Sequence, residues 1–361
     1  MGKGILLPFS WLYGALAKWR NYLYDKGIKK SARFDIPIIC IGNITVGGTG
    51  KTPMSEYLIR LLSASFQTSL LSRGYRRRSR GFVMATESSS ACDIGDEPLQ
   101  IHRKFPDITV AVQEKRAEGI RHLRQVKPDT EVILLDDAFQ HRAVKPSLSL
   151  LVIDYGRPVF DDCLLPAGRL REPVQGMKRA DIIVVSKCPE NLSEGDRQAF
   201  VSRLRPEKGQ GVFFSHIRYT AVLPAYPDKC RFAGGQPSTL KESGIPLLAF
   251  CGIGSPQSFS DYIRQLDERA EVLTFPDHHR YTDKDIQHLV SASRKVRENN
   301  GLVITTEKDF CRLPELPLAE ELASCLCYLS MEVKFSGEQE TLFNQMITKH
   351  VRTFSTSRRM D

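Results

Sequence analysis

The sequence predicts an α/β protein built on a parallel sheet that is covered by helices on both faces. Three observations lead to this fold class. Apolar, strand-like runs alternate with helical stretches, a glycine-rich turn joins the first strand to the first helix, and the alternation resumes after one break. The chain has 361 residues, of which 41% are hydrophobic, and this length suits about two globular domains.

The predicted elements follow one another in the order that a parallel sheet requires. Strands are expected at 37–41, 68–71, 108–112, 132–135, 148–153, 182–185 and 212–217, with helices at 54–62 and 114–126. Residues 221–246 are rich in Pro, Gly, Lys and Ser, which indicates a connection. Beyond it, strands are expected at 247–250, 272–275 and 302–305, with helices that start at 256 and 283. We therefore predict an N-terminal helix (1–34), a large domain (35–220), a connection (221–246) and a smaller α/β domain (247–361).

The N-terminal segment is uncharged from residue 4 to 17, which is shorter than the roughly 20 residues that a membrane-spanning helix needs. A signal peptide is an alternative, because Ala15-Leu16-Ala17 resembles a cleavage site, but the motifs downstream need ATP, which is found in the cytoplasm. Apolar residues recur at steps of three and four, namely Phe9, Leu12, Leu16, Trp19 and Leu23. This stripe, with lysines beside and after it, predicts an amphipathic helix in the membrane interface. The alternative is a helix that packs on its own domain.

Charge and cysteine content narrow the class of protein. The net charge of +9 suits an acidic partner such as a nucleotide, a nucleic acid or an anionic membrane. The basic residues are spread along the chain without an aromatic-basic recognition motif, so we expect no nucleic-acid partner. The nine cysteines form no CxxC pair, which predicts free thiols in a reducing compartment. Cys325 and Cys327 would share one face of a strand, where core packing is favoured over metal binding.

The most specific motif is a phosphate-binding loop between the first strand and the first helix. It reads Gly47, Gly48, Thr49, Gly50, Lys51 and Thr52. Glycines let backbone N–H groups face phosphate oxygens, Lys51 can reach the β- and γ-phosphates, and the Thr52 hydroxyl can bind Mg²⁺. The strict Walker A pattern has Gly where this chain has Thr45. The sequence nevertheless predicts a P-loop NTPase-like domain that binds ATP.

A pair of carboxylates, Asp136 and Asp137, ends the predicted strand 132–135. At the carboxyl edge of a parallel sheet, near the P-loop, such carboxylates can hold Mg²⁺ directly or through water. An ordinary turn aspartate is the alternative for an isolated motif of this kind. Together with the P-loop, the pair predicts a magnesium site formed by Thr52, Asp136 and Asp137.

Several further motifs occur in a fixed order along the chain. They are Ser72-Arg73-Gly74-Tyr75, Gly95-Asp96-Glu97-Pro98, Lys115-Arg116, Asp136-Asp137-Ala138-Phe139-Gln140-His141, Arg169-Leu170-Arg171-Glu172-Pro173, Asp277-His278-His279 and Thr306-Glu307-Lys308-Asp309. With the P-loop, this combination resembles the tetraacyldisaccharide 4′-kinase family of lipid A biosynthesis. Two departures are that Ala138 stands where the family usually has Gly and that residues 335–361 carry none of the motifs.

The resemblance implies a reaction and a place in the cell. The family transfers the γ-phosphate of ATP, with Mg²⁺, to the 4′-hydroxyl of a tetraacyldisaccharide 1-phosphate, which gives lipid IVA in lipopolysaccharide biosynthesis. It implies a peripheral or monotopic protein at the cytoplasmic side of the bacterial inner membrane, and we expect a monomer.

The resemblance also implies roles for particular residues. Asp96 would accept the hydroxyl proton, and His278 would orient the Asp96 carboxylate. Lys51 and Asp137 would act at the phosphates. Because His278 lies in the smaller predicted domain, this pairing implies that the two domains close over the substrate. Without the resemblance, Asp96 in Gly-Asp-Glu-Pro would be taken as a helix start.

Further site residues follow from the same resemblance. Glu172 would lie near nucleotide and metal, or else be an ion-paired loop carboxylate beside Arg169 and Arg171. The positions that match contacts to the lipid substrate are Tyr75, Arg116, Gln140, His141 and Arg171.

Other classes of P-loop protein fit less well. A membrane-associated ATPase switch of the ParA type would carry an extra lysine early in the loop, and residues 45–50 contain none. A GTPase would need an Asn-Lys-x-Asp motif, and Ser186-Lys187-Cys188-Pro189 lacks both the Asn and the Asp. The ATPase switch is kept as the alternative function.

Overall fold

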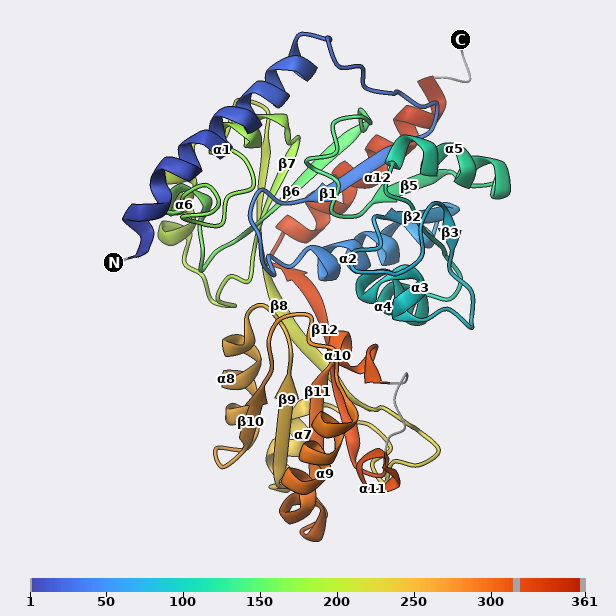
Figure 1. The fold of residues 1–361 in the computed structure, drawn as a ribbon, viewed down its shortest axis with the longest axis vertical. Coiled ribbons are helices and arrows are strands. Elements are labelled where there is room, and N and C mark those ends of the chain that lie inside the picture. The colour runs from blue at the N-terminus through green and yellow to red at the C-terminus, as the bar shows by residue number, and fades with distance from the viewer. Residues whose placement is uncertain (1, 314–318, 358–361) are drawn as a thin grey trace. The chain divides into compact units, whose positions relative to one another are not determined.

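The computed structural model describes residues 2–313 and 319–357. The chain divides into two compact units, shown in Figure 1. Unit 1 comprises Met1–Glu87, Ile101–Ile217 and Val333–Asp361, and unit 2 comprises Ser88–Gln100 and Arg218–Glu332. The chain therefore leaves unit 1 and returns to it twice.

Unit 1 is organised around a mostly parallel sheet with the strand order β8-β7-β6-β1-β5-β2-β4-β3. The strands are β1 (Ile38–Gly42), β2 (Thr68–Ser72), β3 (Val83–Met84), β4 (Thr109–Val112), β5 (Val132–Leu135), β6 (Leu148–Asp154), β7 (Ile182–Ser186) and β8 (Gly211–Pro224). Only β3, at the edge, is paired antiparallel among these described strands. Strands such as Val132–Leu135 are uninterrupted apolar runs because both faces of a parallel sheet are covered.

Helices cover both faces of this sheet. The helices of unit 1 are α1 (Gly2–Asp25), α2 (Lys51–Ser63), α5 (Arg116–Val126), α6 (Glu194–Leu204) and α12 (Gln339–Ser357), with short 3₁₀ turns at Val159–Asp161 and Val174–Arg179. Alternate residues of β1 point to opposite faces: Ile38 lies in one core with Leu123 of α5, and Ile39 in the other with Met54 of α2 and Phe343 of α12.

Unit 2 repeats the arrangement on a smaller scale, with the strand order β10-β9-β11-β12. These strands are β9 (Leu247–Cys251), β10 (Glu271–Thr274), β11 (Leu302–Thr306) and β12 (Leu326–Phe335), all paired parallel. Its helices are α3 (Ala91–Ile94), α7 (Pro237–Ser243), α8 (Pro256–Leu266), α9 (Asp283–Glu298), α10 (Glu307–Phe310) and α11 (Glu320–Ala323), and α4 (Asp96–Lys104) begins in it. Phe259 of α8 and Leu289 of α9 lie in the cores on the two faces.

The division of the chain differs from the predicted domains. The predicted connection, residues 221–246, belongs to unit 2. Its first residues are part of β8, which continues to Pro224. Further along, Leu240 of α7 is buried in a core of unit 2. The predicted C-terminal domain is also too long. Residues 333–361 return to unit 1, where Phe343 and Ile347 are buried, and residues 358–361 of that domain lie outside the described part of the chain.

Candidate active site

The P-loop lies between β1 and α2 in unit 1. Gly47 and Gly50 have φ angles of 102° and 91°, a backbone region that glycine enters without a Cβ penalty. The Asn43 side chain donates a hydrogen bond to the Thr49 hydroxyl at 2.9 Å. Lys51 and Thr52 are the first two residues of α2. The predicted strand, glycine-rich turn and helix therefore occur in the order that phosphate binding requires.

The two predicted metal ligands have different surroundings at the end of β5. Asp136 is buried and accepts hydrogen bonds from the hydroxyl groups of Ser55, at 3.0 Å, and Ser72, at 3.3 Å. Asp137 has a left-handed φ of 44° and lies 3.5 Å from the Lys51 ammonium and 3.1 Å from the Arg171 guanidinium. Burial alone would raise the pKa of Asp137, but the charges of Lys51 and then Arg171 lower it, so this carboxylate is ionised at neutral pH.

Thr52, Asp136 and Asp137 fit a magnesium ion that is shared with bound phosphates. Mg²⁺ takes oxygen ligands and usually keeps several waters, so one or two carboxylates and a hydroxyl from the protein are sufficient. No cluster of three or more His, Cys, Asp or Glu side chains arranged for a metal was found in 2–313 and 319–357, and a phosphate-bound Mg²⁺ does not require one.

Glu172 is 3% exposed and is enclosed by hydrogen-bond donors. Arg179 pairs with its carboxylate at 2.9 Å, the Gln140 amide donates at 2.8 Å, and the Asn21 amide of α1 donates at 3.3 Å. The ion pair that the sequence allowed with Arg169 or Arg171 is made by Arg179 instead. Glu172 thus links α1 to the segment that follows Asp137.

Two of the predicted lipid-contacting residues touch each other directly. The His141 Nε2 atom accepts a hydrogen bond from the Arg116 backbone N–H at 3.3 Å. Burial, and then the charges of Arg116, Arg20 and Arg73, lower the pKa of His141 to about 4, so this imidazole is neutral at neutral pH. Arg116 is 2% exposed, and burial lowers its pKa to about 10, which leaves it charged.

The other predicted lipid-contacting residues are Gln140, Arg171 and Tyr75. Gln140 also donates to the Asn43 carbonyl at 2.7 Å, and Arg171 forms the ion pair with Asp137 described above. Tyr75 is 58% exposed in the segment after β2, with the Arg76 guanidinium above its ring.

Asp96 and His278 are in contact, and both belong to unit 2. Asp96 is the first residue of α4, and its Oδ2 atom lies 3.2 Å from Nδ1 of His278, which has a left-handed φ of 57°. The two residues of the predicted pair therefore fall in one unit, and not in two units as the predicted domain bounds imply. The segment Ser88–Gln100, which carries Asp96, leaves unit 1 and packs in the same unit as His278. The helix start that Gly-Asp-Glu-Pro indicates is also present.

Asp96 has a second partner that sequence reasoning missed. The Arg312 Nε atom donates to Oδ2 of Asp96 at 2.8 Å, and its Nη1 atom donates to the fully buried Asp309 at 2.9 Å. Burial alone would raise the pKa of Asp96. The hydrogen bond from His278 and the charge of Arg312 outweigh it and lower the pKa to about 2.

Lys308 completes this cluster. Its ammonium lies 3.1 Å from Glu97 and 3.5 Å from the Nε2 atom of His278. In the sequence, the Thr306-Glu307-Lys308-Asp309 motif indicates Lys308 and Asp309 as candidate site residues. Arg312 lies three residues after the end of this motif.

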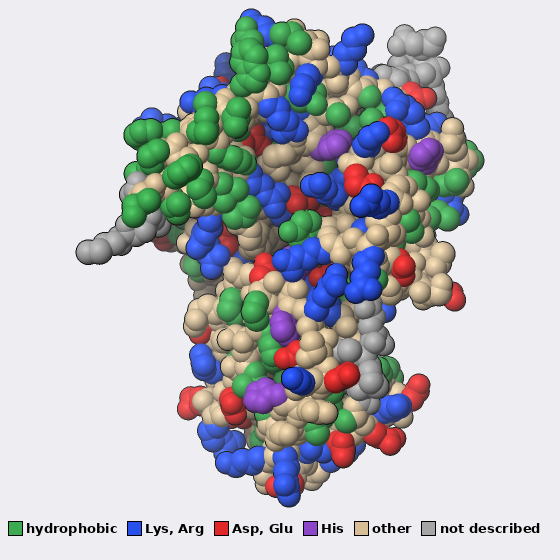
Figure 2. All heavy atoms as spheres, viewed as in Figure 1, with side chains coloured by type: hydrophobic (Ala, Val, Ile, Leu, Met, Phe, Trp, Pro, Cys, Tyr) green, Lys and Arg blue, Asp and Glu red, His purple; other side chains and the backbone are tan. Residues whose placement is uncertain are grey.

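Helix α1 presents two unlike faces to its surroundings. On one, the Ser10 hydroxyl donates to the Leu164 carbonyl at 2.9 Å and the Tyr13 hydroxyl donates to the Arg171 carbonyl at 2.7 Å. On the other, Figure 2 shows hydrophobic side chains gathered over the helix. The most exposed are Ile5, Phe9, Trp11, Leu12, Leu16 and Trp19. Across the described part of the chain, no helix combines the length and apolarity needed to cross a membrane.

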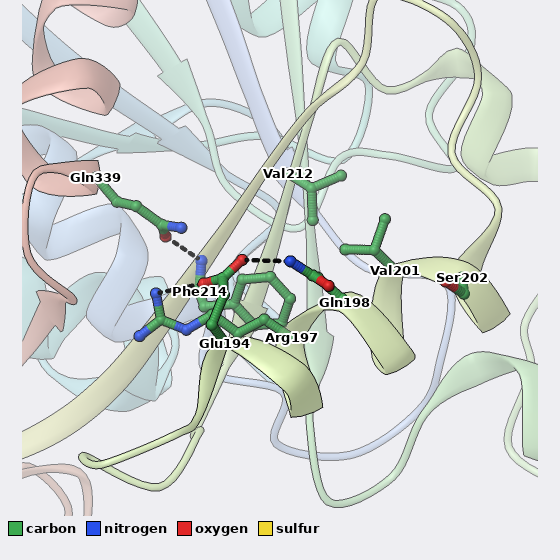
Figure 3. Close-up of a pocket in the computed structure, with 8 residues that line it drawn as sticks. All are labelled: Glu194, Arg197, Gln198, Val201, Ser202, Val212, Phe214 and Gln339. Carbon is green, nitrogen blue, oxygen red and sulfur yellow. Dashed lines mark hydrogen bonds and ion pairs between the residues drawn. The ribbon is translucent and has the colours of Figure 1, made fainter.

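A surface depression of about 450 Å³ lies elsewhere in unit 1. It is formed mainly by α6 and β8, and Gln339 at its rim accepts a hydrogen bond from the Phe214 N–H at 2.9 Å (Figure 3). It shares no residue with the P-loop or with the Asp96 cluster.

Known proteins resemble this chain over almost its whole length. The family model described as "Tetraacyldisaccharide-1-P 4'-kinase" matches residues 3–352. The chain is 44% identical to the tetraacyldisaccharide 4'-kinase of Bacteroides thetaiotaomicron over 352 residues, which are 96% of this chain and 93% of that protein. It is 43% identical to the protein of the same name from Flavobacterium johnsoniae over 350 residues, or 97% of each chain.

A solved structure matches as well. The LpxK structure from Aquifex aeolicus, in complex with ATP, is 30% identical, covers 97% of this chain and 100% of its own, and has a TM-score of 0.74. The predicted α/β class and the resemblance stated from the motifs are both confirmed. The chain therefore belongs to the tetraacyldisaccharide 4′-kinase family.

Proposed function

We propose that this chain transfers the γ-phosphoryl group of ATP to the 4′-hydroxyl of a tetraacyldisaccharide 1-phosphate, the lipid A precursor, and so forms lipid IVA. The observation that carries the proposal is the match over residues 3–352 to a family of kinases with this name. The relatives are named as kinases, which favours this function over an ATPase switch. We further propose that the protein works as a monomer.

The P-loop of unit 1 supplies the nucleotide site. The backbone of Gly47, Gly48, Thr49 and Gly50 surrounds the phosphates, and Lys51 offsets their negative charge. The Asp137 carboxylate pairs with the Lys51 ammonium and with the Arg171 guanidinium, so it holds both cations beside the loop. Thr52, Asp136 and Asp137 would hold Mg²⁺, which neutralises charge on the β- and γ-phosphates when it is bound.

Asp96 serves as the general base for the sugar hydroxyl. When His278 is neutral, its Nδ1–H donates to Oδ2 of Asp96 while Nε2 accepts from Lys308. Arg312 donates to the same carboxylate oxygen. Within the described residues no hydrogen bond reaches the other oxygen, Oδ1, so this atom is the one that can accept the hydroxyl proton.

Arg116, Gln140, His141, Arg171 and Tyr75 contact the lipid. Because His141 is neutral at physiological pH, it can hydrogen-bond a sugar or acyl oxygen but cannot form an ion pair. The guanidinium groups suit the anomeric phosphate of the precursor. The carboxylate of Glu172 is bound by Arg179, Gln140 and Asn21. The role of Glu172 is therefore to hold the Gln140 side chain in place beside the nucleotide site.

A direct assay tests the proposed function. Purified protein is incubated with ATP, Mg²⁺ and the tetraacyldisaccharide 1-phosphate, and the lipid is analysed by mass spectrometry. We expect a product that carries one additional phosphate on the distal sugar. ATP hydrolysis without a phosphorylated lipid would support the ATPase switch instead.

Replacing the metal-site carboxylates should change the magnesium requirement. In Asp136→Asn and Asp137→Asn, the site loses a negative charge, so we expect the Mg²⁺ concentration for half-maximal activity to rise roughly 10- to 100-fold. The measurement is the initial rate as a function of Mg²⁺ at saturating ATP. The exposed Asp129→Asn serves as the control, and an unchanged Mg²⁺ dependence in both site variants would remove them from the metal site.

We propose that α1 attaches the protein to the cytoplasmic face of the inner membrane. Its polar contacts with Leu164 and Arg171 fix one face, and its exposed apolar side chains can enter the acyl boundary. Both predicted roles of this helix, packing and membrane contact, can therefore hold on opposite faces.

The double variant Leu12→Asp/Leu16→Asp should release the protein from vesicles. These leucines are 62% and 61% exposed, and with about 1.5 kcal/mol of burial lost at each, partitioning should fall on the order of 100-fold. Sedimentation with anionic vesicles gives the bound fraction. Leu342→Asp/Met346→Asp on α12 is the matched control, because it adds the same charge at exposed apolar positions outside α1. Equal binding of both double variants would leave α1 with a packing role alone.

A further inference from the structure

Two successive residues at the end of β7 hold two successive carbonyl groups of the P-loop. The Ser186 hydroxyl donates a hydrogen bond to the Thr49 carbonyl at 2.5 Å. The Lys187 ammonium donates to the Gly48 carbonyl. These partners lie 137 and 139 positions apart in the sequence. Neither residue belongs to the P-loop motif or to the other motifs that carry the family resemblance.

Lys187 is itself fixed in place. Its ammonium forms an ion pair of 2.9 Å with the Oδ2 atom of Asp154, the last residue of β6. The Oδ1 atom of Asp154 accepts a hydrogen bond from the Gly156 N–H at 2.9 Å. The backbone of Lys187 has a left-handed φ of 57°, which is uncommon for a residue with a side chain. Asp154 and the local backbone thus direct the cation toward the Gly48 carbonyl.

The Ser186 contact is equally constrained. Ser186 is 1% exposed. A Cβ atom on Gly50 would lie 3.0 Å from the Ser186 hydroxyl oxygen, and Gly50 has a φ of 91°. Glycine at position 50 therefore allows both the turn and the close approach of the Ser186 side chain.

The physical consequence concerns peptide orientation. The C=O and N–H groups of one peptide unit point in opposite directions. Holding the Gly48 carbonyl on Lys187 therefore fixes the direction of the Thr49 N–H, and holding the Thr49 carbonyl on Ser186 fixes that of the Gly50 N–H. If either peptide turned over, a carbonyl dipole would face the phosphates in place of an N–H group, and anion binding would weaken.

We propose that Ser186 and Lys187 are positioning residues that hold the P-loop peptides in the orientation that binds nucleotide phosphates. The proposal rests on the proposed function only in taking ATP as the nucleotide. It assigns to β7 a part in nucleotide affinity, through contacts to the backbone of the loop and not to the substrate.

The test is direct nucleotide binding by the full chain, without lipid. A fluorescent ATP analogue with Mg²⁺ is titrated into wild-type protein and into Lys187→Met, which keeps the length of the side chain and removes its charge. We expect Kd to rise roughly 10- to 100-fold, the range for losing a hydrogen bond from a charged group. Lys187→Arg should recover part of this loss, because it restores a cationic donor. Lys178→Met removes an exposed lysine that pairs with Glu207 and should leave Kd unchanged.

Kinetics and stability separate positioning from general damage to the fold. In Lys187→Met, the KM for ATP should rise while the KM for the lipid stays near the wild-type value. The melting temperature without nucleotide should fall, because the buried Asp154 loses its cation. Lys187→Arg keeps that cation and should have a melting temperature near the wild-type value. Ser186→Ala gives a second, smaller perturbation, with an expected rise in Kd of about 3- to 10-fold. If Lys187→Met fails to fold, Ser186→Ala still tests the inference.

The outcomes for the two proposals are distinct. If wild-type protein binds the analogue but phosphorylates no lipid, the proposed function fails and the inference about the P-loop can still be read from Kd. Wild-type values of Kd and KM for ATP in Ser186→Ala, or in a folded Lys187→Met, would overturn the inference.

Discussion

Replacing Lys51 by Ala is expected to abolish phosphoryl transfer while leaving the fold intact. Lys51 is the only lysine within the P-loop motif and lies 3.5 Å from Asp137. Phosphoryl transfer depends on positioning and charge neutralisation, so removing this cation should lower kcat by roughly 10³-fold or more. The measurement is the turnover number at saturating ATP and lipid, compared with the melting temperature of the same preparation.

Two features of the structure make this test interpretable. Lys51 contributes no apolar side chain to the cores of unit 1, so its removal should change the melting temperature little. Removing its charge also leaves Asp137 with Arg171 as a partner at 3.1 Å, so no buried carboxylate is left without a cation. Lys145→Ala, at an exposed position in the same unit, is the control. Near-normal kcat in Lys51→Ala would refute the assignment of the P-loop.

Much of the α/β fold could be predicted because parallel strands buried on both faces are continuous apolar runs. The predicted strand at 132–135 coincides with β5, and the predicted helix start at 256 coincides with that of α8. The division into units could not be predicted in the same way. Nothing local in residues 88–100 or 333–361 indicates which sheet they join, because that depends on packing partners far away in the sequence.

The candidate site shows the same contrast between local and distant information. The P-loop and the Asp136-Asp137 pair are local motifs, and their chemistry follows from their order after buried strands. Asp96 and His278 are 182 positions apart, and only the family resemblance joined them in the sequence. Arg312 and Lys187 act through hydrogen bonds to residues that are also distant in sequence, and each belongs to a residue type that is abundant on protein surfaces, so only the structure singles them out.

Replacing either member of the Asp96–His278 pair should cost about as much as replacing both. Asp96→Ala removes the proposed base, and kcat should fall roughly 10²–10⁴-fold, the usual range for general-base catalysis, with a smaller change in the KM for ATP. His278→Ala removes the group that orients the carboxylate and should have a similar effect. Because the two residues are in contact at 3.2 Å within unit 2, the double variant should be little worse than either single one.

A neighbouring pair provides the control for this double-mutant cycle. His279 contacts Asp285 at 3.1 Å in the same unit but has no assigned part in the reaction, so His279→Ala should keep its kcat. Small single effects, or effects that multiply in the double variant, would leave Asp96 as the first residue of α4 with no catalytic role.

The pH dependence of kcat/KM tests the part played by Arg312. The charged and titratable groups in contact with Asp96 are His278 and Arg312. Lys308 lies beyond His278 and pairs with Glu97, and Asp309 accepts a hydrogen bond from Arg312. In the wild-type protein the pKa of Asp96 is about 2, below its ordinary value, so the base is ionised at every pH above that point and is lost only as pH falls through it.

In Arg312→Met, the charge that lowers the pKa of Asp96 is removed while its burial remains, so the pKa should rise. Activity should then fall at a higher pH than in the wild-type protein, and an acid limb should appear in the measurable range. Arg312→Lys should keep most of the wild-type profile, because a cation remains near the carboxylate. If Arg312→Met lowers the rate equally at all pH values, then Arg312 supports the fold through Asp309 and does not tune the base.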